Sequence, residues 1–114
     1  MTGLDRTMSF LRGEAVDHPP FHPIIMRGAA KQAGVKYRDF CLDPHAKCRA
    51  MSECAREFGI DWVTVMSDPW AEASAFGIMV DYPEDNLPVD TGGHFPDAAS
   101  AAKIRQYDVR KNLY

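Results

Sequence analysis

The chain has 114 residues, and its 13 Lys and Arg against 16 Asp and Glu give a formal net charge of −3. This length suits one domain, a hydrophobic content of 46% excludes a disordered tail, and scattered basic residues argue against nucleic acid or an anionic membrane as partner. No apolar run approaches the roughly 18 residues of a membrane span, and three cysteines are too few for a disulfide scaffold, so we expect a cytoplasmic protein.

Residues 1–20 form a predicted lead-in to the main fold. Apolar residues recur there at helical spacing: Leu4, Met8 and Leu11. This stripe predicts a short amphipathic helix that ends at Gly13. The sequence His18-Pro19-Pro20 follows and predicts a non-helical turn, because two prolines remove backbone donors.

In residues 21–114 predicted helices alternate with predicted strands, which is typical of the α/β class. The apolar run 21–26 predicts the first strand, and a short helix over 29–33 follows. Asp43-Pro44 predicts the start of the longest helix, because an aspartate cap precedes a proline at the first helical position. This helix ends at Gly59. Its predicted buried stripe consists of Cys48, Met51, Ala55 and Phe58.

The second half of the chain continues the alternation. Residues 60–66 read I-D-W-V-T-V-M and predict a parallel strand covered on both faces. Asp68-Pro69 repeats the cap signal and predicts a helix through Phe76. A third strand is predicted over 78–82, a turn-rich segment over 85–93 and a last helix over 98–104. Because so few parallel strands make a poor sheet, we expect the chain to be part of a larger fold.

Candidate site residues follow the first two predicted strands. Arg27 comes directly after the strand that ends at Met26, and Ser67 and Asp68 follow the strand that ends at Met66. Function in α/β folds concentrates at the carboxyl ends of strands, so Arg27 and Asp68 should face one crevice. The alternatives are a solvated surface arginine and a helix cap that stabilises by roughly 1 kcal/mol.

The cysteines and histidines do not predict a metal site. His45, Cys48 and Cys54 lie on one predicted helix, but their spacing is not one that brings zinc ligands together. Free cysteine is often buried, and core packing is the simpler interpretation of both thiols. His18 and His22 are separated by two prolines, so no helical face unites them.

Several short motifs occur in an order that resembles the uroporphyrinogen decarboxylase superfamily. They are Leu11-Arg12-Gly13-Glu14, His18-Pro19-Pro20, Met26-Arg27, Asp43-Pro44, Phe58-Gly59-Ile60-Asp61, Met66-Ser67-Asp68-Pro69, Glu72-Ala73 and Phe76-Gly77. The resemblance covers roughly residues 4–90. The superfamily contains tetrapyrrole decarboxylases and methyltransferases that exchange methyl groups with corrinoid proteins, and its fold is a (β/α)₈ barrel.

By this resemblance, residues 1–114 would be the N-terminal portion of such a barrel, with the first βα units in residues 21–114. A barrel of eight strands needs about 250 residues, so we expect this chain to be too short to close one and to be inactive alone. The resemblance also implies roles for single residues. Asp68 matches an aspartate that accepts hydrogen bonds from pyrrole N–H groups and stabilises developing positive charge.

Arg27 matches the first arginine of the family stretch M-R-Q-A-G-R-Y, which binds substrate carboxylates. Lys31 stands where the second arginine would be, so a planar bidentate fork is lost, and Gln32 replaces the tyrosine. Ser67 belongs to the family's S-D pair. The resemblance thus implies Asp68 as the catalytic residue, with Arg27, Lys31 and Ser67 binding substrate.

The departures at Lys31 and Gln32 favour a corrinoid-linked methyltransferase as the full-length activity. The resemblance implies zinc and a corrinoid for that branch, with a corrinoid protein as partner and zinc ligands expected beyond Tyr114. The first alternative is a true uroporphyrinogen decarboxylase, which acts on a tetrapyrrole and needs no cofactor. The second is a non-catalytic, truncated module that forms homo-oligomers by covering its open sheet edges with another copy.

Overall fold

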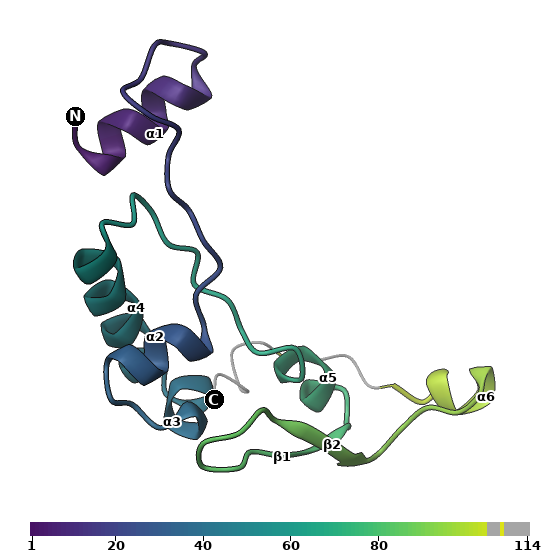
Figure 1. The fold of residues 1–114 in the computed structure, drawn as a ribbon. Helices are drawn as coiled ribbons and strands as arrows, with labels where there is room; N and C mark the ends of the chain where they lie inside the picture. The colour runs from purple at the N-terminus through teal and green to yellow at the C-terminus, as the bar shows by residue number, and fades with distance from the viewer. Residues whose placement is uncertain (105–107, 109–114) are drawn as a thin grey trace.

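The computed structural model describes residues 1–104 and Asp108. Its elements follow the chain in this order: α1 (Gly3–Leu11), α2 (Arg27–Gln32), α3 (Tyr37–Leu42), α4 (Pro44–Phe58), α5 (Ala71–Ala75), β1 (Met79–Asp81), β2 (Val89–Gly92) and α6 (Ala98–Ala101). Figure 1 shows α2, α3 and α4 packed together, with α1 and α6 set apart from them. The radius of gyration of 18.0 Å exceeds the roughly 13 Å of a compact 100-residue domain.

The hydrophobic core lies between α2, α3 and α4. Helix α4 begins where predicted, because the Asp43 side chain accepts the backbone N–H of His45 at 2.8 Å. It ends at Gly59, whose φ of 61° is left-handed and suits glycine. The core consists of Ala29, Ala30, Tyr37, Phe40, Cys41, Ala50, Met51 and Cys54.

The predicted buried stripe of α4 is wrong by part of a turn. Its buried residues are Lys47, Ala50, Met51 and Cys54, whereas Cys48 and Phe58 are exposed. Lys47 lies on the inner face because its aliphatic stem can pack there while its ammonium group lies 5.9 Å from the centroid of the Phe40 ring. A hydrophobic pattern that counts lysine as polar therefore places the buried face of α4 on the wrong side of the helix.

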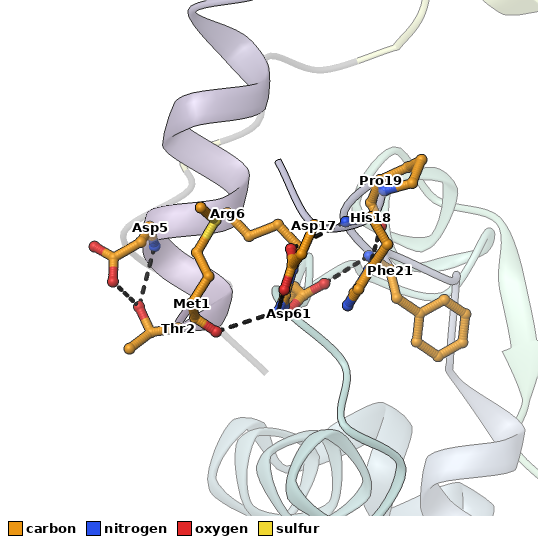
Figure 2. Close-up of polar contacts among 9 residues, drawn as sticks. All are labelled: Met1, Thr2, Asp5, Arg6, Asp17, His18, Pro19, Phe21 and Asp61. Carbon is orange, nitrogen blue, oxygen red and sulfur yellow. Dashed lines mark hydrogen bonds and ion pairs between the residues drawn. The ribbon is translucent and has the colours of Figure 1, made fainter. Parts of the chain in front are cut away.

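Helix α1 also buries a different face from the predicted one. Leu4, Met8 and Leu11 are exposed, and the buried residues are Arg6 and Thr7. The Arg6 guanidinium donates to both carboxylate oxygens of Asp17, at 2.7 and 2.9 Å, and forms an ion pair with Asp61 (Figure 2). Polar contacts rather than apolar packing therefore attach α1 to the rest of the chain.

Residues 21–26 and 60–66 are extended, but the prediction that they are strands is wrong. They lie side by side, and the Asp61 N–H donates to the Phe21 carbonyl oxygen at 3.0 Å. Side chains make the next contacts, because the Asp61 carboxylate accepts the Phe21 N–H at 2.7 Å and His22 Nδ1 donates to the Trp62 carbonyl at 2.9 Å. These contacts replace the regular backbone ladder that defines a sheet.

The sheet of the described residues is an antiparallel hairpin and not the expected parallel arrangement. β1 pairs with β2, with Asp81 opposite Val89. β1 lies inside the predicted third strand, whereas β2 falls in the segment predicted to be turn-rich. Helix α3 was not predicted, and the last helix ends at Ala101 instead of residue 104. The mixture of helices and a small sheet agrees with the α/β class at the coarse level.

Candidate functional site

Asp68 is a buried carboxylate at the end of the second extended segment. Its side chain and backbone together are 1% exposed. One carboxylate oxygen accepts the backbone N–H of Trp70 at 2.9 Å, which fixes the turn that precedes α5. The Tyr82 hydroxyl lies 3.4 and 3.3 Å from the two oxygens and donates to them. The prediction that Asp68 caps a helix beginning at Pro69 is wrong, because α5 begins at Ala71 and its N-cap is Trp70. Asp68 instead stabilises the turn before the helix and has a second contact from a distant residue.

Arg27 and Lys31 lie one turn apart on α2 and line the same cavity. The cavity has a volume of about 280 Å³, and its remaining walls are Ala30, Val35, Tyr37 and Asp85. The Arg27 guanidinium donates to the Asp85 carbonyl oxygen at 2.8 Å. Two cationic side chains thus face a space large enough for a small acidic group. The structure brings together these two predicted residues as their i, i+4 spacing requires.

Tyr37 connects this cavity to Asp68. It lies in the core on α3 and also lines the cavity. Burial is the main cause that raises the pKa of Tyr37 to about 12; the negative charge of Asp68 raises it further, and the positive charge of Arg27 lowers it. Both charges therefore act on one hydroxyl, although Asp68 itself does not line the cavity. The prediction that Arg27 and Asp68 face one crevice is therefore wrong in detail. Arg27 lines the cavity, whereas Asp68 is buried beside it.

Among the described residues, Ser67 neither lines the cavity nor hydrogen-bonds to the Asp68 carboxylate; it bonds to Glu72 instead. Its hydroxyl donates to the carboxylate of Glu72 on α5, and this hydrogen bond lowers the pKa of Glu72. The contact holds the start of α5 against the preceding extended segment. In this structure Ser67 acts on the local backbone rather than lining the cavity.

Sequence reasoning missed three residues of this region: Tyr37, Tyr82 and Asp85. Tyr37 begins a helix whose six residues were too few to show a periodic pattern. Tyr82 ends a predicted strand, where an aromatic side chain is expected to pack in a core. Asp85 lies in the turn-rich segment and carried no signal of its own.

The described residues do not fit a zinc site. Cys41 and Cys54 are buried in the helical core, and Cys48 is exposed. Across residues 1–104 and Asp108, no group of three or more His, Cys, Asp or Glu side chains could hold a metal ion. The interpretation of both thiols as core residues is therefore confirmed for Cys54 and wrong for Cys48.

Comparison with known proteins places this arrangement in a family. The family model described as Uroporphyrinogen decarboxylase (URO-D) matches residues 2–114, and the chain belongs to this family. The searches of curated proteins and of solved structures each gave no match. Within the part of the chain that the structure describes, no helix combines the length and apolarity needed to cross a membrane.

Proposed function

We propose that this chain supplies the first, substrate-facing part of a uroporphyrinogen-decarboxylase-like enzyme. The observation that carries this proposal is the buried Asp68 carboxylate beside a cavity with two cationic side chains, Arg27 and Lys31. The substrate class is a tetrapyrrole with acidic side chains. Its carboxylates would bind Arg27 and Lys31, and its ring N–H groups would donate to Asp68.

The chemistry of Asp68 suits this role. An ionised carboxylate only accepts hydrogen bonds, so it matches a ring that presents N–H donors. The Trp70 N–H holds one of its oxygens at 2.9 Å, which fixes the orientation of the group before substrate arrives. When an acetate side chain loses carbon dioxide and takes up a proton, positive charge develops on the pyrrole. A preorganised carboxylate stabilises that charge.

The two extended segments support a place in a (β/α)₈ barrel. Residues 21–26 and 60–66 lie side by side with the Asp61 N–H bonded to the Phe21 carbonyl, as neighbouring strands would. Large apolar side chains on these segments are exposed: Phe21, Ile24, Trp62, Val65 and Met66. We propose that in a complete barrel these segments would pair as its first two strands, with further strands covering their exposed side chains.

Binding of a fluorescent tetrapyrrole tests the role of Asp68. We would titrate the chain with uroporphyrin I, which has eight carboxylates and ring N–H groups. Asp68→Asn should weaken binding by about tenfold or more, because hydrogen bonds to charged groups contribute about 1.5–3 kcal/mol. The matched control is Asp81→Asn, which removes the same charge from an exposed position on β1. Equal affinities of the two variants would contradict the proposal.

Corrinoid-linked methyl transfer is the second candidate, and Lys31 favours it. A lysine lacks the bidentate fork that the decarboxylases use at this position. Corrinoids carry amides in place of most acidic side chains, so their binding should not depend on the cation pair. We would compare the effect of Arg27→Gln on the affinities for uroporphyrin I and methylcobalamin. A loss confined to uroporphyrin supports the decarboxylase branch, whereas tight, Arg27-independent binding of methylcobalamin supports methyl transfer.

Self-association remains a proposal that the exposed apolar surface supports. Ile24 is 77% exposed and Leu4 is 71% exposed, which is unusual for side chains of this size. A second copy would cover such surface in the isolated chain. Sedimentation velocity over a range of concentrations measures this directly, and a monomer at all concentrations would contradict it.

A further inference from the structure

The loop between the two strands of the hairpin crosses the candidate site. Residues 82–88 connect β1 to β2, and we call them the strap. The Trp70 indole N–H donates to the carbonyl oxygen of Pro88 at 3.1 Å, and Pro88 is buried. At the other end of the strap, the Tyr82 hydroxyl contacts both oxygens of Asp68. The strap therefore covers the carboxylate that the proposed function assigns to substrate.

Cationic side chains hold the strap against α2 and α3. The Arg38 backbone N–H donates to the Glu84 carbonyl at 3.1 Å, and its guanidinium donates to the Tyr82 carbonyl. The Lys36 ammonium donates to the Asp85 carboxylate at 2.6 Å. These contacts are solvent-exposed, and exposed ion pairs contribute little to stability. The strap is thus attached by several individually weak contacts.

Asp85 joins the strap to the cation-lined cavity. It lines the cavity with Arg27 and Lys31, and its carbonyl oxygen takes the Arg27 guanidinium at 2.8 Å. The hydrogen bond from Lys36 lowers the pKa of Asp85, so the carboxylate is ionised at neutral pH. An acidic ligand that binds the Arg27 guanidinium must therefore displace the Asp85 carbonyl oxygen from it.

The two ends of the hairpin meet at glycines, which gives the strap a place to pivot. Gly77 precedes β1 with a φ of 108°, and Gly93 follows β2 with a φ of 79°. Both angles lie in the region that favours glycine. A side chain at Gly93 would clash with the carbonyl oxygen of Gly77, so the two backbones are in close contact. The hairpin is therefore joined to the rest of the chain at a narrow base.

We propose that the strap is a ligand-released cover: an acidic ligand in the cavity takes the Arg27 guanidinium from the Asp85 carbonyl oxygen, the strap lifts, and Tyr82 leaves Asp68. This inference rests on the proposed function for the substrate-facing role of Asp68. The displacement itself involves only Asp85, Arg27 and a carboxylate ligand. It can therefore be measured without any assumption about catalysis.

Hydrogen exchange at the two tryptophan indoles tests the release of the strap. The probe is tricarballylate, a small tricarboxylate that has no ring N–H groups and does not absorb with tryptophan. Saturating ligand should speed exchange of the Trp70 indole N–H, which bonds to Pro88, by about tenfold or more. The Trp62 indole lies outside the strap and is the internal control. Binding that leaves Trp70 exchange unchanged, or slows it, would overturn the inference.

Paired variants test the competition. Asp85→Asn should bind tricarballylate about threefold or more tightly than wild type, because it removes the carboxylate that pairs with Lys36, so that the strap is held less firmly and the open state is more populated. Asp81→Asn carries the same charge change away from the cavity and should bind like wild type. Equal tightening in both variants, or no binding to any of the three proteins, would overturn the inference. These results could hold while Asp68→Asn leaves uroporphyrin binding unchanged. That outcome would support the release of the strap and contradict the proposed role of Asp68 in substrate binding.

Discussion

The guanidinium of Arg6 in α1 forms an ion pair with Asp61, although the two residues lie 55 positions apart in the chain. The same guanidinium holds Asp17, and the second oxygen of Asp61 accepts the Phe21 N–H. One side chain thus connects the first helix, the proline-rich turn and both extended segments. We expect Arg6 to be the residue on which docking of α1 depends.

Arg6→Gln should release α1. Hydrogen exchange of the α1 amides should rise by about tenfold or more, since few apolar contacts hold this helix. The matched control is Arg12→Gln at the end of α1, where the arginine pairs with Glu14 on the exposed surface. Exposed pairs contribute little, so this variant should exchange like wild type. Equal effects of the two variants would show that Arg6 has no special role.

Acid should release the same helix. The hydrogen bond from Arg6 lowers the pKa of Asp17, and the backbone N–H of Phe21 is the largest cause that lowers the pKa of Asp61. A carboxylate with a lowered pKa in the folded state stabilises fully above its ordinary value, near 4, and loses that contribution as pH falls through the folded value. Exchange of α1 amides should therefore accelerate below about pH 4, after correction for intrinsic rates. A flat profile down to pH 2 would contradict this prediction.

The three cysteines should differ sharply in reactivity. Burial is the main cause that raises the pKa of Cys41 to about 11, so at pH 8 only about one thiol in a thousand is ionised. Cys54 is also buried, whereas Cys48 is exposed. Iodoacetamide at pH 8 should label Cys48 first in the folded protein, and all three after denaturation. Peptide mass spectrometry distinguishes them, and labelling of Cys41 as fast as Cys48 would contradict the structure.

Phe40 should contribute more to stability than any other single phenylalanine of α3 and α4. Its ring is fully buried between helices, so Phe40→Ala should lower the free energy of unfolding by about 3–5 kcal/mol. Phe58→Ala is the control, because Phe58 is 57% exposed, and we expect a change of about 0.5 kcal/mol. Urea unfolding followed by circular dichroism measures both. Similar losses in the two variants would mean that the core does not lie where the structure puts it.

Helix boundaries were predictable from sequence where a cap fixed them. Asp43-Pro44 and Gly59 define α4 because they satisfy backbone groups locally, and no distant residue is needed. The buried face of the same helix was not predictable, since it depends on how Lys47 packs against Phe40. Residues 60–66 were expected to be a strand because their side chains are apolar. A strand also requires a partner's backbone, and local sequence carries no information about that.

The candidate site divides in the same way. Arg27 and Lys31 share a cavity because both lie on one helix, which spacing alone indicates. The contact between Asp68 and Tyr82 depends on the hairpin folding back over α3, and nothing near either residue predicts it. Residues that act together across the chain were therefore missed, whereas those within one element were found.

Asp43 closes α3 and opens α4, so a single residue separates the two helices. A connection of one residue cannot absorb a change in the orientation of either helix. A rotation of α4 about its axis should therefore also move α3. Helix α3 contributes Tyr37 to the cavity wall and Phe40 to the core. The shape of the cavity therefore depends on how α4 packs against α3. Inserting one residue at this connection should let α3 move independently of α4. Tyr37 would then no longer be held in the cavity wall that faces Arg27 and Lys31.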